Sequence, residues 1–116
     1  MVIVIAKNKV SIATLQEMAK KMFGNLVKAV VDTEKEIMAI DGELHADEQA
    51  LLLENDSKQE NLWGINIYPD KSGEDFVEFD SVINIRPSQQ NRSRGVGIPE
   101  IKEKILEIVN KLVEAR

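Results

Sequence analysis

The stretch LWGINIYPDKSGEDFVEFDSVINIR, residues 62–86, contains the two clearest predicted strands of the chain. Residues 62–68 and 76–86 alternate between apolar and polar side chains, which is typical of strands with two different faces. The loop 69–75 between them contains Pro69 and Gly73, two residues that favour turns. The stretch therefore predicts an antiparallel hairpin.

The hairpin is expected to have an apolar face, which includes Trp63, and a polar face. The alternation places five polar residues on the second face: Asn66, Glu78, Asp80, Asn84 and Arg86. A symmetric loop would pair Asn66 with Glu78 and Gly64 with Asp80. A glycine inside a strand often marks a bulge or the close approach of another group. This face is either a water-exposed sheet surface or the floor of a binding site.

Outside the hairpin, hydrophobic periodicity predicts helices at residues 12–23, 46–54 and 99–114. Ser11 is a suitable N-cap for the first helix, Gly24 a suitable stop, and Pro99 a suitable first residue for the last. Short apolar segments at 2–6, 26–31 and 36–40 predict strands, the last two forming a hairpin around the turn 32–35.

The predicted order is β-α-β-β-α-β-β-α in a single domain, residues 1–116. It indicates the α+β class, with a largely antiparallel sheet of about five strands and helices packed mainly on one face. We expect the first and third helices to cover the same face. The other face is left to solvent or to a second copy of the chain.

The composition excludes several classes of protein. The 116 residues are 43% hydrophobic and 30% charged, which argues against disorder. The chain has no cysteine, so disulfides and thiolate chemistry are excluded. It has no apolar run near 18 residues and no secretory leader, which predicts a cytoplasmic protein without a membrane partner. The net charge of −5 argues against coating duplex DNA.

The residues after the hairpin are unusually basic. Three of the four arginines fall in residues 86–94, and residues 86–95 contain no acid. Guanidinium groups, hydroxyls and amides all donate hydrogen bonds to phosphate, and the loop leads into the N-terminus of the last helix. The segment thus predicts a site for a phosphate-bearing ligand, such as a nucleotide, built from Arg86, Ser88, Asn91, Arg92, Ser93 and Arg94 with Asn84 and Asn66 beside it.

The alternatives are a flexible connector or arginines paired with the protein's own carboxylates. Neither the GxxxxGK[ST] nor the GxGxxG phosphate-binding pattern is present.

His45 is the only histidine and stands between Glu43 and Asp47. The chain has no HxH or HExxH spacing, so no metal site is predicted, and the sequence assigns no cofactor. Histidine titrates near neutral pH, which makes His45 and Asp80 the candidate catalytic residues of a small hydrolase or transferase acting on an anionic substrate. This role requires both residues to lie close to the basic segment 86–95, which we call the arginine loop. The common alternative is a histidine that hydrogen-bonds a neighbour.

Three stretches together are familiar: GELHADEQALLLE (42–54), LWGINIYP (62–69), and EFDSVINIRPSQ (78–89) with NRSRGV (91–96). The chain resembles a family of small, stand-alone prokaryotic proteins described as a domain of unknown function. The resemblance extends over nearly the whole chain and implies a complete protein of a prokaryotic cytoplasm. It implies no activity, cofactor or catalytic residue. One difference is Asp41, where the family is expected to have glycine.

Three functions remain open: a binding module for an anionic ligand, an enzyme acting on an anionic substrate, and a non-catalytic homodimeric interaction protein. The arginine loop favours the first.

Overall fold

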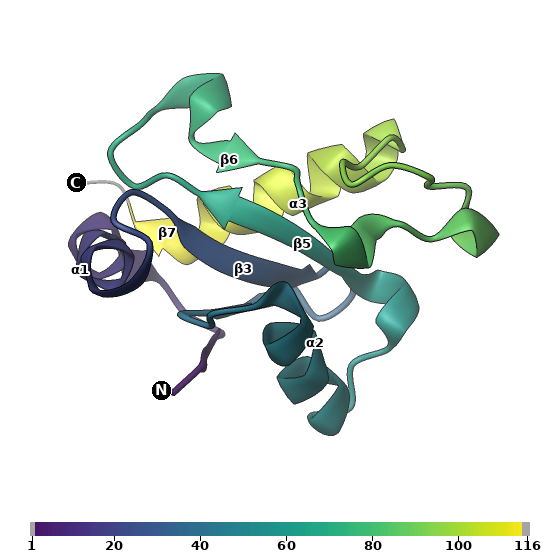
Figure 1. The fold of residues 1–116 in the computed structure, drawn as a ribbon, viewed down its shortest axis with the longest axis horizontal. Helices are drawn as coiled ribbons and strands as arrows, with labels where there is room; N and C mark the ends of the chain where they lie inside the picture. Colours follow the sequence, from purple (N-terminus) through teal and green to yellow (C-terminus); the bar gives the residue numbers. More distant parts are fainter. Residues whose placement is uncertain (1, 115–116) are drawn as a thin grey trace.

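The computed structural model describes residues 2–114, with a five-stranded antiparallel sheet at the centre (Figure 1). The strands lie in the order β1-β4-β3-β5-β6. Their bounds are Val4–Ala6 (β1), Val27–Asp32 (β3), Ile37–Ile40 (β4), Leu62–Ile67 (β5) and Val77–Glu78 (β6). The predicted α+β class and the antiparallel sheet of five strands are confirmed.

The three helices lie on both faces of this sheet. Side chains of α1 (Ile12–Met22) and α3 (Pro99–Leu112) share the larger core cluster with Trp63, which confirms that these helices cover one face. The third helix, α2 (His45–Glu54), places Leu52 against Val30 and Leu62 in a second core cluster. The face that the sequence leaves to solvent or to a second copy is therefore covered by this chain's own α2.

The ends of the predicted helices lie within two residues of the observed ends. The Ser11 hydroxyl accepts a hydrogen bond from the Thr14 N–H at 3.1 Å, and Pro99 is the first residue of α3. The prediction that the last helix reaches residue 114 is wrong. It ends at Leu112, because β7 (Val113–Glu114) pairs in parallel with β2 (Val10–Ser11). None of the helices in residues 2–114 is long and apolar enough to cross a membrane.

Asp32 closes the β3–β4 hairpin without a glycine. Its carboxylate accepts from the N–H groups of Glu34 and Lys35, both at 2.9 Å, and from the Ser57 hydroxyl at 2.6 Å. An aspartate that bonds the backbone of a turn in this way can replace the usual glycine signal. The left-handed conformation appears further along, at Glu36 (φ 56°) and at Asp41 (φ 68°). Asp41 thus occupies a conformation that glycine adopts without strain, as the family resemblance implied.

The β5–β6 hairpin has the predicted register at its closed end. Asn66 pairs with Glu78 and Ile67 with Val77. The predicted strand 76–86 is wrong beyond this point, because the strand ends at Glu78 and Gly64 has no strand partner on this side. The chain instead forms two 3₁₀ turns, Val82–Asn84 and Pro87–Gln89. Residues 79–95 therefore cross the end of β5 as an irregular segment, which we call the crossing segment.

Candidate functional site

The crossing segment is attached to β5 through the side chain of Asn84, which is fully buried. Its carboxamide oxygen accepts from the Gly64 N–H at 2.8 Å, and its amide nitrogen donates to the Gly64 carbonyl at 2.9 Å and to the Arg94 carbonyl at 2.9 Å. These bonds replace the strand that would otherwise pair with Gly64. A buried backbone group needs such a partner, so Asn84 has a structural role.

Asn91 organises the second half of the segment in a similar way. Its amide donates to the carbonyls of Asn84 (2.7 Å) and Gly95 (2.8 Å), and its oxygen accepts from the Gly97 N–H at 2.8 Å. The Gly97 N–H, which precedes α3, is thus bonded within the protein. The structure places Asn84 and Asn91 in the scaffold of the loop, which corrects their expected place in a phosphate-binding surface.

Arg86 is also part of the scaffold. Its guanidinium donates to the carbonyls of Ile83 (3.0 Å), Gln59 (2.6 Å) and Leu62 and to the Gln89 side chain (3.1 Å), and lies 4.2 Å from the centre of the Trp63 ring. Burial lowers the pKa of Arg86 from its usual value. These contacts use four guanidinium N–H groups, so Arg86 does not present a fork to an external anion, contrary to the sequence interpretation.

Arg92, Ser88 and Ser93 lie on the outside of the crossing segment, and all three are exposed. Among the ion pairs of the described residues, none includes Arg92. The structure therefore separates the three arginines of the loop: one is buried in the scaffold, one is exposed, and one, Arg94, is paired.

Arg94 pairs with Asp80 across the crossing segment. Its Nε lies 2.5 Å from the Asp80 carboxylate, with about half of each side chain exposed. The hydrogen bond to Asp80 raises the pKa of Arg94 further above its usual value. One of the alternatives weighed from the sequence, an arginine paired with the protein's own carboxylate, is therefore present at this position. The terminal guanidinium nitrogens have no partner among the hydrogen bonds of residues 2–114.

His45 is the first residue of α2 and is buried, with 8% of its surface exposed. Its Nε2 lies 2.7 Å from the Ile65 carbonyl. A carbonyl only accepts hydrogen bonds, so Nε2 carries the proton and Nδ1 of the neutral ring carries the lone pair. Burial lowers the pKa of His45 below its usual value, more than the bond to Ile65 raises it. The lowered pKa favours the neutral ring, in which Nδ1 is a proton acceptor.

Asn66 connects β5 with the end of β6. Its amide donates to the Glu78 carboxylate at 2.9 Å and to the Asp80 carbonyl at 3.4 Å, and the Tyr68 hydroxyl donates to the same Glu78 oxygen at 2.9 Å. The carboxamide oxygen of Asn66 is buried and has no partner. Buried polar atoms are almost always hydrogen-bonded, so this oxygen is an unsatisfied acceptor inside the site.

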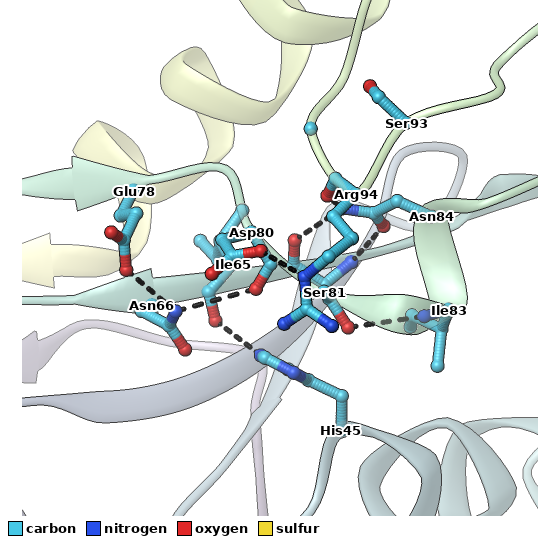
Figure 2. A network of polar contacts seen from close by, with 12 residues as sticks. His45, Ile65, Asn66, Glu78, Asp80, Ser81, Ile83, Asn84, Ser93 and Arg94 are labelled. Atoms are coloured by element: carbon cyan, nitrogen blue, oxygen red, sulfur yellow. Dashed lines mark hydrogen bonds and ion pairs between the residues drawn. The ribbon is translucent and has the colours of Figure 1, made fainter.

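These side chains meet on the α2 side of the sheet (Figure 2). We call His45, Asn66, Glu78, Asp80 and Arg94 the polar cluster. The charges of Asp80 and Arg94 are close enough to act on the pKa of His45, and Figure 2 shows the Arg94 guanidinium on the side of the network that faces the histidine. His45 and Asp80 thus lie near one arginine of the segment, Arg94, and the catalytic role of the two residues stays a prediction.

Sequence reasoning missed one charged neighbour of the cluster. Lys28 pairs with Asn66 in the register of β3 and β5, and its charge also acts on His45. The alternation of residues 26–31 contains this lysine, but only the pairing of β3 with β5 places it beside Asn66. Within residues 2–114, no three His, Asp or Glu side chains are grouped so that they could hold a metal ion.

The fold and the cluster define a small α+β protein with a buried neutral histidine next to a partly exposed ion pair. The chain belongs to the family described as "Protein of unknown function (DUF5674)", which matches residues 3–112. The resemblance found in the sequence is thus confirmed, and the prokaryotic origin stays a prediction. Comparison with curated proteins and with solved structures gave no match.

Proposed function

We propose that the polar cluster is the site of a proton-transfer enzyme, a small hydrolase or transferase that acts on an anionic substrate. The observation that carries this proposal is the position of the Arg94 guanidinium, paired with Asp80, on the side of the network that faces His45 (Figure 2). Titratable groups with pKa values changed by burial and by charged neighbours are concentrated at functional sites. Three candidate residues of the loop, Arg86, Asn84 and Asn91, hold the crossing segment in place. Three others, Ser88, Arg92 and Ser93, lie on its exposed outside.

In this proposal His45 is the general base. The bond from Nε2 to the Ile65 carbonyl holds the ring in one tautomer and directs the lone pair to Nδ1. Nδ1 takes the proton from a water molecule or a substrate hydroxyl, and the resulting imidazolium is stabilised by the negative charge of Asp80, which favours the protonated form. A positioned base of this kind contributes roughly a hundredfold to ten-thousandfold to a rate.

Arg94 holds the substrate in the same proposal. Asp80 bonds Nε and fixes the plane of the guanidinium, which leaves the terminal nitrogens to bind two oxygens of a phosphate or carboxylate. The unpartnered oxygen of Asn66 accepts a hydrogen bond from a substrate hydroxyl or amine. A substrate with an acidic group and a neighbouring hydroxyl satisfies both requirements.

The binding module for a phosphate-bearing ligand is the second candidate, because Arg94 serves it equally well without any chemistry at His45. In that case the anion-binding group is Arg94 instead of the whole arginine loop. The homodimer stays a prediction, which sedimentation equilibrium would test.

The single histidine makes binding simple to observe. We would follow the C–H resonances of His45 by proton NMR over pH 4–8, with and without inorganic phosphate or AMP. An anion held by Arg94 raises the pKa of His45, because nearby negative charge favours the imidazolium. Arg94→Ala is expected to abolish this increase. Arg92→Ala, an exposed arginine two residues away, is the matched control and is expected to preserve it.

A measurement of turnover distinguishes the enzyme from the binding module. The probes are nitrophenyl phosphates and nitrophenyl esters of carboxylic acids that carry an additional acidic group. Each probe is assayed with the wild-type protein, His45→Gln and Arg94→Ala. An activity lost in His45→Gln supports the enzyme. A phosphate-dependent change at His45 without turnover of any probe favours the binding module. A His45 pKa that no anion changes would contradict both.

A further inference from the structure

A groove of about 1070 Å³ lies between the loop that follows β5, β6 and one side of α3. Its apolar part is formed by Ile12, Phe76, Val77, Phe79, Leu106 and Val113. Lys102, Leu106 and Asn110 follow one another at intervals of one helical turn, so one stripe of α3 borders the groove along its length. Ligand pockets of proteins have about 300–1,000 Å³ and a mostly apolar lining, so this groove is large enough for an organic molecule.

The charged residues of the groove give it a positive rim. Lys102 holds its ammonium 5.1 Å from the centre of the Phe79 ring, and Lys71 holds its ammonium 4.6 Å from the centre of the Tyr68 ring. Neither lysine takes part in an ion pair in the part of the chain that the structure describes. Glu74 is the one acid that lines the groove within residues 2–114. The two ammonium groups are thus available to an anion from outside.

We propose that this groove binds an amphipathic carboxylate, such as a fatty acid. Its alkyl chain would cover Phe76, Phe79 and Leu106, and its carboxylate would lie at the lysine rim. The apolar lining favours an apolar occupant, because burying apolar surface away from water is favourable. The two unpaired lysines determine the sign of the headgroup, because a cationic amphiphile would meet like charge in the same place.

The apolar part of the groove is a second site, and it touches the polar cluster only at its rim, where Lys71 packs on Tyr68, whose hydroxyl bonds Glu78. Val77 and Phe79 line the groove, while Glu78 and Asp80 belong to the polar cluster. The proposal therefore does not depend on the activity proposed for His45, and either can fail without the other.

The test compares two amphiphiles with the same chain length and opposite charge. Dodecanoate and dodecyltrimethylammonium are titrated into ¹⁵N-labelled protein, both below their micelle concentrations, and amide shifts are followed. We expect saturable binding of dodecanoate, with the largest shifts around Phe76, Phe79 and Leu106, and at least tenfold weaker binding of the cation.

Variants test the two parts of the groove separately. Lys71→Gln combined with Lys102→Gln is expected to weaken dodecanoate binding at least tenfold, and Lys58→Gln, an exposed lysine outside the groove, to leave it unchanged. Leu106→Gln tests the apolar part with the lysines intact and is also expected to weaken binding. The proposal is overturned by equal binding of both amphiphiles, by shifts centred outside the groove, by unchanged affinity in the double variant, or by no binding of dodecanoate.

Discussion

The side chain of Asn84 bonds both backbone groups of Gly64, accepting from its N–H at 2.8 Å and donating to its carbonyl at 2.9 Å. The Asn84 carboxamide therefore pairs with the backbone of β5 at Gly64, where a neighbouring strand would otherwise pair. This allows the chain to leave the sheet after Glu78 without leaving the N–H and carbonyl of Gly64 unpaired. The departure brings Asp80 and Arg94 towards His45, so the scaffold contact and the polar cluster have the same structural origin.

Replacing Asn84 with alanine should strongly destabilise the protein. Asn84→Ala removes three hydrogen bonds and leaves the Gly64 N–H and carbonyl buried without partners. We expect the free energy of unfolding to fall by about 3 kcal/mol, measured by urea denaturation. Asn110→Ala, at an exposed position on α3, is the control and should change it by less than about 0.5 kcal/mol. Equal effects of the two variants would contradict the role of Asn84.

Gly64 is predicted to tolerate no side chain while Ser81 is present. A Cβ at Gly64 would lie 2.6 Å from both the Cβ and the Oγ of Ser81, and 3.2 Å from the His45 ring. Gly64→Ala should therefore lower the free energy of unfolding by about 2 kcal/mol. Ser81→Gly removes the atoms that clash, so the double variant should be more stable than the sum of the single effects predicts. Simple additivity would show that the contact is not the cause.

Arg86 and Arg92 should differ in their effect on stability although both belong to the arginine loop. Arg86→Ala leaves three backbone carbonyls without their donor and uncovers the Trp63 ring, so we expect a loss of about 2–4 kcal/mol. Arg92→Ala should change stability by less than about 0.5 kcal/mol. The single tryptophan allows both unfolding curves to be followed by fluorescence. A stable Arg86→Ala variant with unchanged Trp63 emission would refute the scaffold role.

Glu48 should make the protein less stable as the pH rises. It is fully buried, and burial raises its pKa to about 9, with Asp41 and Asp47 adding to the shift and Lys28 and the Gly42 N–H opposing it. Between pH 4.5 and 9 the unfolded chain releases this proton and the folded chain keeps it, so the free energy of unfolding falls, by at most about 1.4 kcal/mol per pH unit.

Glu48→Gln keeps an acceptor for the Gly42 N–H, which Glu48 binds at 2.9 Å. The variant should lose this pH dependence and exceed the wild type in stability at pH 8, in urea denaturation at a series of pH values. Parallel curves for the two proteins would contradict a protonated Glu48.

His45 should make the protein less stable as the pH falls. Its folded pKa lies below 6.5 because of burial, and Lys28 and Arg94 lower it further while Asp80 raises it. Below pH 6.5 the unfolded chain binds a proton that the folded chain resists, so stability falls as the pH falls through this range. His45→Gln should remove this part of the acid dependence. A His45 pKa at or above 6.5 in the NMR titration would be incompatible with the buried neutral ring.

The polar face of the β5–β6 hairpin shows where sequence reasoning succeeds and where it ends. The pairing of Asn66 with Glu78 is the one that a symmetric loop predicts, and the hydrogen bond from the Tyr68 N–H to the Phe76 carbonyl at 2.9 Å closes the loop in this way. Asn84 and Arg86 were predicted on the same face and are found in the scaffold instead. Alternation carries no information after a strand ends, and nothing local marks the end at Glu78.

The arginine loop shows the same limit for the candidate site. Proximity in sequence suggested that Arg86, Arg92 and Arg94 would face one ligand. Each side chain extends in the direction that the folded backbone gives it, so one is buried against Trp63, one is exposed and one pairs with Asp80. From the sequence, the enzyme hypothesis only requires that His45 and Asp80 lie close together. Whether they do depends on how α2 packs beside β5.

The amino-acid pattern by itself determined the α+β class, the five strands and the apolar faces of α1 and α3, because periodicity and capping act over a few residues. The tertiary structure alone decided where β6 ends, that α2 covers the second face, and which arginine stands beside the histidine. These depend on contacts between residues distant in the chain, such as Asn84 with Gly64, whose bonds form only when the whole sheet is assembled.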